Sequence, residues 1–243
     1  MVITYIFLSV LVVSLISLIG VVSLLFDEKR LEKILFWLIS FAAGSMLGGA
    51  FIHLLPELIN SGNVSTYTSI SILSGIFIFF ILEKIIHWRH CHVLTSNDHP
   101  HSLALMNLIG DGLHNFLDGV LIAGSYMVSP SVGLATTVAV ALHEIPQEIG
   151  DFGVLIHAGL TRTKALFFNL LSALVSVAGA FLTIWLYSLT TNIINTITAF
   201  AAGGFIYIAV GDLLPELKKE SGLVDSLKQI FGLLAGIAIM IFL

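Results

Sequence analysis

Residues 40–58 read SFAAGSMLGGAFIHLLPEL, and residues 199–217 read AFAAGGFIYIAVGDLLPEL. The two segments are identical at 10 of 19 positions without a gap. Each is an apolar stretch close to the length of about 20 residues that a helix needs to cross a bilayer. Small residues alone could recur because they favour close helix–helix contacts. The LLPEL shared at the same offset instead indicates an internal repeat of a membrane-spanning helix.

The composition excludes a water-soluble globule. Of the 243 residues, 57% are hydrophobic and 10% are charged, whereas soluble domains contain about 25% charged residues. Eight apolar stretches of spanning length follow one another along the chain. We therefore predict an all-α integral membrane protein with eight transmembrane helices that form a single domain over residues 1–243. The predicted spans are 3–25, 34–58, 67–88, 102–126, 131–158, 163–187, 193–217 and 224–243.

The basic residues predict the orientation of the chain. All ten Lys and Arg residues lie in or beside the segments that follow the first, third, fifth and seventh spans. Because Lys and Arg are enriched in cytoplasmic loops, we predict that both termini are extracytoplasmic. The repeated spans, the second and the seventh, then cross in opposite directions. We predict a 3+2+3 arrangement in which spans 1–3 and 6–8 are inverted repeats, a plan that recurs in secondary transporters.

Polar residues inside a bilayer are costly and usually functional, and here they concentrate in the fourth and fifth spans. The fourth contains NLIGDGLHNFLDG from Asn107, and the fifth contains HEIPQEIGDFG from His143. His114 and His143 each lie twelve residues, or about 18 Å of helix, from the start of their spans. Because the two spans are antiparallel, we expect the two histidines to meet at mid-membrane depth.

These residue types indicate a metal site. Imidazole nitrogen and carboxylate oxygen suit zinc and its neighbours, and a cation would neutralise carboxylates that are costly to bury. A polar packing network, a proton relay, a non-transporting metal sensor and an intramembrane metal-dependent hydrolase are the alternatives. The HExxH pattern of metalloproteases is not met, because Gln147 replaces its second histidine. The residues that we expect to carry divalent metal ions across are His114, Asp118, His143 and Gln147.

At these residues the sequence resembles the ZIP (Zrt-, Irt-like protein) family of divalent-metal transporters. The motifs are His-Asn-x-x-Asp-Gly at 114–119 and His-Glu-x-Pro-Gln-Glu-x-Gly-Asp at 143–151. The second motif is similar to the branch whose signature is HExPHExGD, and the resemblance covers the whole chain. It implies uptake of Zn²⁺, with Cd²⁺, Fe²⁺ and Mn²⁺ as further candidates, into the cytoplasm across the cell membrane. It also implies an elevator-like motion, a homodimer and no enzymatic activity.

The resemblance further implies which residues bind the metal. Met46, in the second span, would add a thioether to the first site. An adjacent second site would use Asn115 and Glu144, with Gln147 or Glu148 nearby. Gln147 stands where this branch often has histidine. The implied metal ligands are Met46, His114, Asn115, Asp118, His143, Glu144, Gln147 and Glu148.

The segment 87–101 after the third span holds a further group of candidate ligands. It contains five histidines and Cys91 on the predicted cytoplasmic side. Their spacing fits no single closed zinc motif, so weak metal binding and a flexible polar loop are the two interpretations. The single cysteine of the chain excludes an intrachain disulfide. The chain has no basic stripe of the kind that binds nucleic acid.

Overall fold

The computed structural model describes all residues except 27, 63, 93–99, 191–192 and 219–221, and within the described part every regular element is a helix. In the same part of the chain, six helical stretches are long and apolar enough to cross a membrane. These stretches, which make the chain a multi-pass membrane protein, are Val2–Val22, Lys33–Asn60, Thr66–Lys84, Arg162–Leu189, Ile193–Leu217 and Leu223–Phe242.

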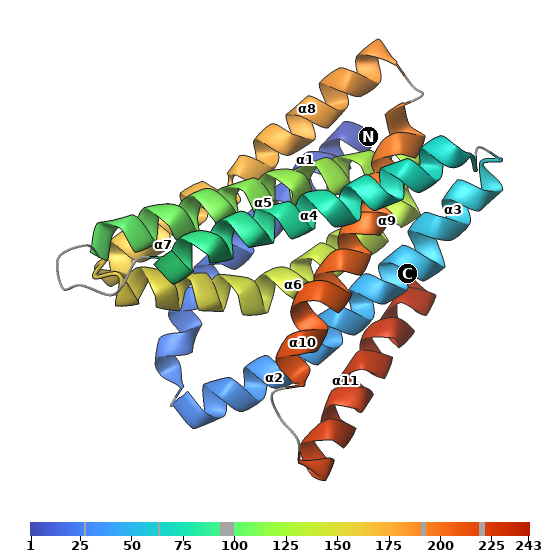
Figure 1. The fold of residues 1–243 in the computed structure, drawn as a ribbon. Helices are drawn as coiled ribbons and strands as arrows, with labels where there is room; N and C mark the ends of the chain where they lie inside the picture. Colours follow the sequence, from blue (N-terminus) through green and yellow to red (C-terminus); the bar gives the residue numbers. More distant parts are fainter. Residues whose placement is uncertain (27, 63, 93–99, 191–192, 219–221) are drawn as a thin grey trace.

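Each of the eight apolar stretches of the sequence is helical, and four of them consist of two or three consecutive elements. The elements are, in order, α1 (Val2–Ile16), η1 (Ser17–Leu25), α2 (Glu28–Gly48), η2 (Gly49–Leu54), α3 (Leu55–Asn60), α4 (Thr66–His92), α5 (Pro100–Val128), α6 (Pro130–His157), α7 (Arg162–Ala173), α8 (Val175–Leu189), α9 (Ile193–Tyr207), η3 (Ile208–Leu213), α10 (Leu214–Leu217) and α11 (Leu223–Phe242). Figure 1 shows these helices packed against one another, with α9 and α10 crossing α4, α5 and α6 at an angle.

The helices α5 and α6 differ from the others. With 29 and 28 residues they are long enough to cross a bilayer at 1.5 Å per residue, yet they are not among the six stretches that qualify by apolarity. They pack against each other and are surrounded by α1, α2, α4, α8 and α9. The polar residues of the fourth and fifth predicted spans are therefore enclosed by more apolar helices.

The two copies of the sequence repeat contain the same local distortion. Six residues of π-helix, η2 in one copy and η3 in the other, occupy equivalent positions of the repeat. In the first copy the backbone N–H of Leu55 donates to the carbonyl of Ala50, five residues back. Pro56 lies two residues after the end of η2, and Pro215 lies two residues after the end of η3. Because a proline ring has no N–H and clashes with the carbonyl one α-helical turn back, the wider π turn accommodates it.

Close glycine contacts join α2 to α11 and α9 to α4. A Cβ atom built on Gly44 would lie 2.1 Å from the carbonyl oxygen of Leu233. Gly203 is the equivalent residue of the second copy, and its Cβ would lie 2.0 Å from the carbonyl oxygen of Ile72. Small residues of this kind let helices approach closely in membranes. Each copy of the repeat therefore makes the same contact with a helix from the other end of the chain.

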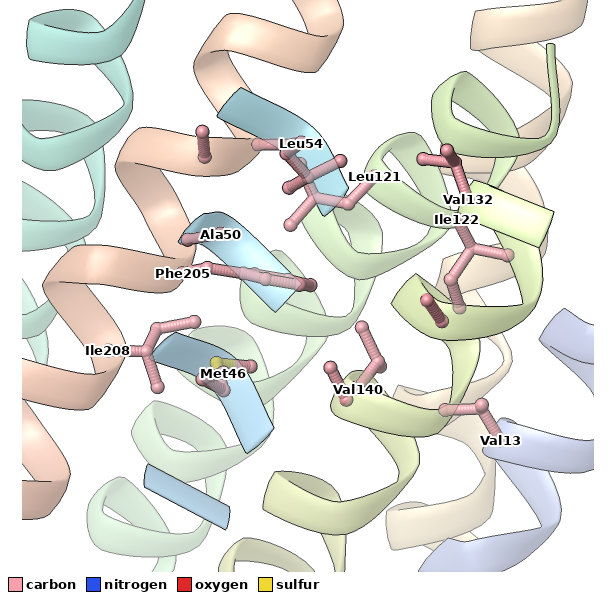
Figure 2. Packing of buried hydrophobic residues seen from close by; sticks show 14 of the residues in the cluster. Val13, Met46, Ala50, Leu54, Leu121, Ile122, Val132, Val140, Phe205 and Ile208 are labelled. Atoms are coloured by element: carbon pink, nitrogen blue, oxygen red, sulfur yellow. The ribbon is translucent and has the colours of Figure 1, made fainter. Parts of the chain in front are cut away.

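An apolar layer fills the space between η2, α5, α6 and α9. Figure 2 shows Leu54, Leu121, Val140 and Phe205 pointing toward one another from these four elements. All four side chains are fully buried. Along α5 these apolar residues follow His114, and along α6 they precede His143. The layer therefore lies on one side of the two histidines, away from the basic segments of the chain.

Candidate metal centre

The two histidines meet between α5 and α6, as the antiparallel spacing predicts. Nε2 of His114 lies 3.0 Å from Nε2 of His143, and the ring planes are inclined by 64°. Nδ1 of His143 lies 3.4 Å from the carbonyl oxygen of Ala139, one turn back. That contact is consistent with a ring that directs its Nε2 toward the other helix. Two imidazole nitrogens this close need either a shared proton or a cation that both can bind.

Two carboxylates complete the group. Oδ2 of Asp118 lies 3.4 Å from Nε2 of His143 and 3.8 Å from Nε2 of His114. Oε1 of Glu144 lies 3.3 Å from Nε2 of His143 and 3.6 Å from Nε2 of His114. Ligand atoms of all four residues fall within 4.8 Å of one another. We call His114, Asp118, His143 and Glu144 the central cluster.

The central cluster matches the coordination that zinc prefers. Zinc bound tetrahedrally at about 2.0–2.1 Å from nitrogen and oxygen ligands separates those ligands by about 3.4 Å. The five separations given above range from 3.0 to 3.8 Å. Both carboxylate oxygens of Asp118 and Oε1 of Glu144 are buried and accept no hydrogen bond from the described part of the chain. Since buried anions are costly without a partner, a divalent cation fits both the geometry and the charge of the cluster.

A cavity of about 350 Å³ reaches the central cluster from the side of the basic segments. His114 borders it and is 16% exposed, whereas the other three side chains of the cluster are at most 1% exposed. The ring of Phe79 meets that of His114 edge-on at 5.7 Å. Glu83 of α4 and Glu216 of α10 also line the cavity, and the basic residues Lys84 and Lys218 follow them closely in the chain. Tyr207 donates a hydrogen bond to Glu83 across this region.

The structure places the other ligands that the motifs imply as follows. Glu144, expected in the second site, joins the two histidines and Asp118, whereas Gln147 lines the cavity. Asn115 donates its amide to Oδ1 of Asp111 at 2.8 Å. Met46 is fully buried among the residues of the apolar layer (Figure 2).

A second group of carboxylates lies near the central cluster. Asp111, Glu148 and Asp151 place one oxygen each within 4.8 Å of one another. Asn169 of α7 donates its amide to Oε2 of Glu148 at 2.5 Å. Of these residues, only Glu148 stands among the ligands implied by the motifs. Asp111 lies one helical turn from Asn115, and Asp151 lies one turn from Glu148, so their spacing could have indicated that they belong to this group. No such pattern in the sequence points to Asn169. The side chains of segment 87–101 lie outside the described residues.

A family model described as ZIP Zinc transporter matches residues 2–104 and 90–243 of the chain. Zinc transporter ZIP13 of Pongo abelii is 35% identical over 221 residues, which cover 84% of this chain and 65% of that protein. A zinc transporter ZIP13 homolog of Drosophila melanogaster is 32% identical over 273 residues, which cover 86% and 77%. Zinc transporter ZIP10 of Homo sapiens is 36% identical over 182 residues, which cover 66% and 22%. The chain thus spans less than two thirds of the first and third of these relatives.

Proposed function

Because the chain belongs to the ZIP zinc transporter family, we propose that it moves Zn²⁺ across a membrane through the central cluster of His114, Asp118, His143 and Glu144. The separations between the four ligand atoms carry this proposal, since they suit a tetrahedral zinc ion. The cluster contains no thiolate, which would hold zinc more tightly than a transported ion requires. Nothing in the comparisons favours the hydrolase alternative, and we propose that the chain is not an enzyme.

We propose that the ion leaves toward the side of the basic segments, which is the cytoplasm by the positive-inside rule. The cavity that borders His114 supports this direction. Polar backbone and side chains at membrane depth are tolerated where they line such a cavity. The apolar layer on the other side of the histidines has to open before an ion can enter from there. Access to the central cluster would then alternate between the two sides.

We further propose eight spans in the 3+2+3 arrangement, with both termini extracytoplasmic and residues 1–243 as one transporter domain. The equivalent π segments η2 and η3 support the inverted repeat. The matching contacts of Gly44 and Gly203 support it independently. The homodimer, the elevator-like motion and transport of Cd²⁺, Fe²⁺ or Mn²⁺ rest on the family resemblance alone. Met46 and Gln147 remain proposed further ligands of the transported ion.

Zinc flux into vesicles tests the proposal. The purified protein is reconstituted into liposomes that hold a zinc-sensitive dye, and the initial rate of dye response is measured. The wild type should admit zinc, and the double variant His114→Ala/His143→Ala should not. His157→Ala is the matched control, because this histidine lies on α6 but is exposed. Absence of flux in folded wild type, or full flux in the double variant, would contradict the proposal.

A further inference from the structure

The aromatic ring of Phe79 packs against the one histidine of the central cluster that is partly exposed to the cavity. Phe79 belongs to α4, lines the same cavity as His114 and is 3% exposed. The two rings are nearly perpendicular, at 87°, and their centroids lie 5.7 Å apart. Aromatic rings attract each other in this arrangement at centroid distances of about 4.5–7 Å. A helix outside the α5–α6 pair therefore contacts the central cluster on the side of the cavity.

Gly204 of α9 provides the space that this ring occupies. A Cβ atom built on Gly204 would lie 2.6 Å from Cε2 of Phe79, and its three nearest atoms outside the local backbone all belong to the Phe79 ring. Any side chain at position 204 would therefore displace the ring. Phe200, one turn earlier on α9, also packs against Phe79, with 6.3 Å between the ring centroids. The position of the Phe79 ring is thus determined by its contacts with α9.

The internal repeat indicates that glycine at position 204 is not required by the helix packing itself. The equivalent residue of the first copy is Ser45. A Cβ atom built on Gly236 of α11 would lie 2.7 Å from the backbone nitrogen of Ser45, and one built on Gly75 of α4 would lie 2.9 Å from that of Gly204. Both copies make the same close approach, with a side chain in one and none in the other. The glycine therefore corresponds to the ring of Phe79.

An imidazole that binds zinc needs a further contact that fixes the orientation of its ring, and such outer partners usually affect metal affinity. For His143 the carbonyl oxygen of Ala139, 3.4 Å from Nδ1, can serve this purpose. For His114 the ring of Phe79 can serve it by direct packing. An apolar ring beside a metal site also limits the access of water. Phe79 is thus placed to affect both the orientation of one ligand and the exit of the ion.

We propose that Phe79 is a positioning residue of the central cluster, which holds the imidazole of His114 in its zinc-binding orientation and slows the exit of zinc into the cavity. This inference rests on the proposed function, because it requires that zinc binds to the central cluster. Phe79 itself offers no ligand atom. Its removal leaves all four ligand residues in the chain but releases one of them, so zinc should dissociate faster.

The rate of zinc release from the full-length protein in detergent tests this role. Protein loaded with less than one zinc ion per chain is mixed with an excess of a chromophoric chelator, and release is followed by stopped flow. Phe79→Leu keeps an apolar side chain but removes the ring, and it should release zinc roughly two- to tenfold faster than the wild type. Phe77→Leu is the matched control on the same helix, because Phe77 is 59% exposed; it should leave the rate unchanged.

The absorption spectrum of bound Co²⁺ separates positioning from plain packing. Co²⁺ can replace zinc, and its visible spectrum depends on the geometry of its ligands. Phe79→Leu should change this spectrum, whereas Phe77→Leu should not.

Gly204→Ala tests the same contact from the other helix. It should also accelerate zinc release, because its Cβ would displace the Phe79 ring. In the Phe79→Leu background it should add little, since leucine has no atom at the Cε2 position. The effects of the two substitutions should therefore be non-additive, as expected for residues in direct contact.

Two results would overturn the role of Phe79. One is a folded Phe79→Leu protein with the release rate and the Co²⁺ spectrum of the wild type. The other is an effect of Gly204→Ala that is equally large with and without the ring. If Phe79→Leu fails to fold in size-exclusion and thermal-unfolding controls, Gly204→Ala decides alone, and a wild-type release rate in that variant overturns the role. A folded wild type that binds no zinc would contradict the proposed function and this inference with it, so the two failures are distinguishable.

Discussion

The two ends of the α5–α6 pair have opposite character. From the level of the histidines toward the basic segments, both helices present carboxylates and amides to a cavity. In the other direction the same helices present Leu121, Ile122, Ala139 and Val140 to a closed apolar layer (Figure 2). An ion can keep part of its hydration on the first side and none on the second. The central cluster therefore lies between the cavity on one side and the closed apolar layer on the other.

Removing both imidazoles of the central cluster is expected to have the largest effect on zinc uptake. His114→Ala/His143→Ala should reduce zinc uptake by vesicles to the background of protein-free vesicles, because only two of the four close ligand atoms remain. The initial rate of dye response measures this. Uptake that persists in the double variant would place the ion path elsewhere than between α5 and α6.

Neutralising one carboxylate should have the next largest effect. Asp118→Asn and Glu144→Gln keep the side-chain shapes but remove a charged ligand from a fully buried position. Altering even an indirect partner of a metal ligand typically costs about 10–100-fold in metal affinity, so each variant should weaken zinc binding at least about tenfold. Isothermal titration of the purified variants checks this. An unchanged affinity for Glu144→Gln would show that this residue is not a ligand.

Most of the helical framework could be predicted from the sequence, because a run of apolar residues of bilayer length has few other stable structures. The meeting of His114 and His143 was predictable as well, since it depends only on helix rise and antiparallel direction. The π turns of η2 and η3 were not predicted, although LLPEL places a proline after each. Their effect on the backbone depends on how the preceding turn adjusts to the missing N–H.

Which of the neighbouring polar side chains comes nearest to the histidines could not be predicted in the same way. Helical periodicity places Gln147 one turn from His143 and on the same face, which favours Gln147 as a ligand. The structure places Glu144, which the motifs imply for an adjacent site, beside the two histidines, and it places Gln147 at the cavity that both histidines line. The rotation of a helix about its axis depends on close packing against helices that are far away in the sequence. One example is the close approach of Gly119 to the carbonyl oxygen of Ser176. Such contacts join segments far apart in the chain and leave no local pattern.

Cysteine labelling tests whether water reaches the cavity but not the apolar layer of the α5–α6 pair. In a Cys91→Ser background, Leu82→Cys should react quickly with a water-soluble thiol reagent, because Leu82 lines the cavity. Leu54→Cys should react slowly, because Leu54 is fully buried in the apolar layer. Mass spectrometry of the labelled protein gives the two rates. Equal rates would mean that the apolar layer does not exclude water.

The smallest effect is expected at Gln147. This residue lines the cavity and offers an uncharged amide oxygen, a weaker ligand than imidazole or carboxylate, so Gln147→Ala should remove at most a hydrogen bond or a weak ligand. A loss of about 0.5–1.5 kcal/mol, or roughly two- to tenfold in zinc affinity, is expected. The comparison with Glu144→Gln decides between the two residues. A larger loss at Gln147 than at Glu144 would favour the ligand set that the motifs imply.

The zinc X-ray absorption spectrum of the wild-type protein shows whether His114 and His143 bind zinc together. With less than one zinc ion per chain, the ion occupies the tightest site. We expect four nitrogen or oxygen ligands at about 2.0–2.1 Å, with the outer-shell scattering of two imidazoles that is lost in His114→Ala/His143→Ala. A spectrum without imidazole scattering, or one that the double substitution leaves unchanged, would contradict it.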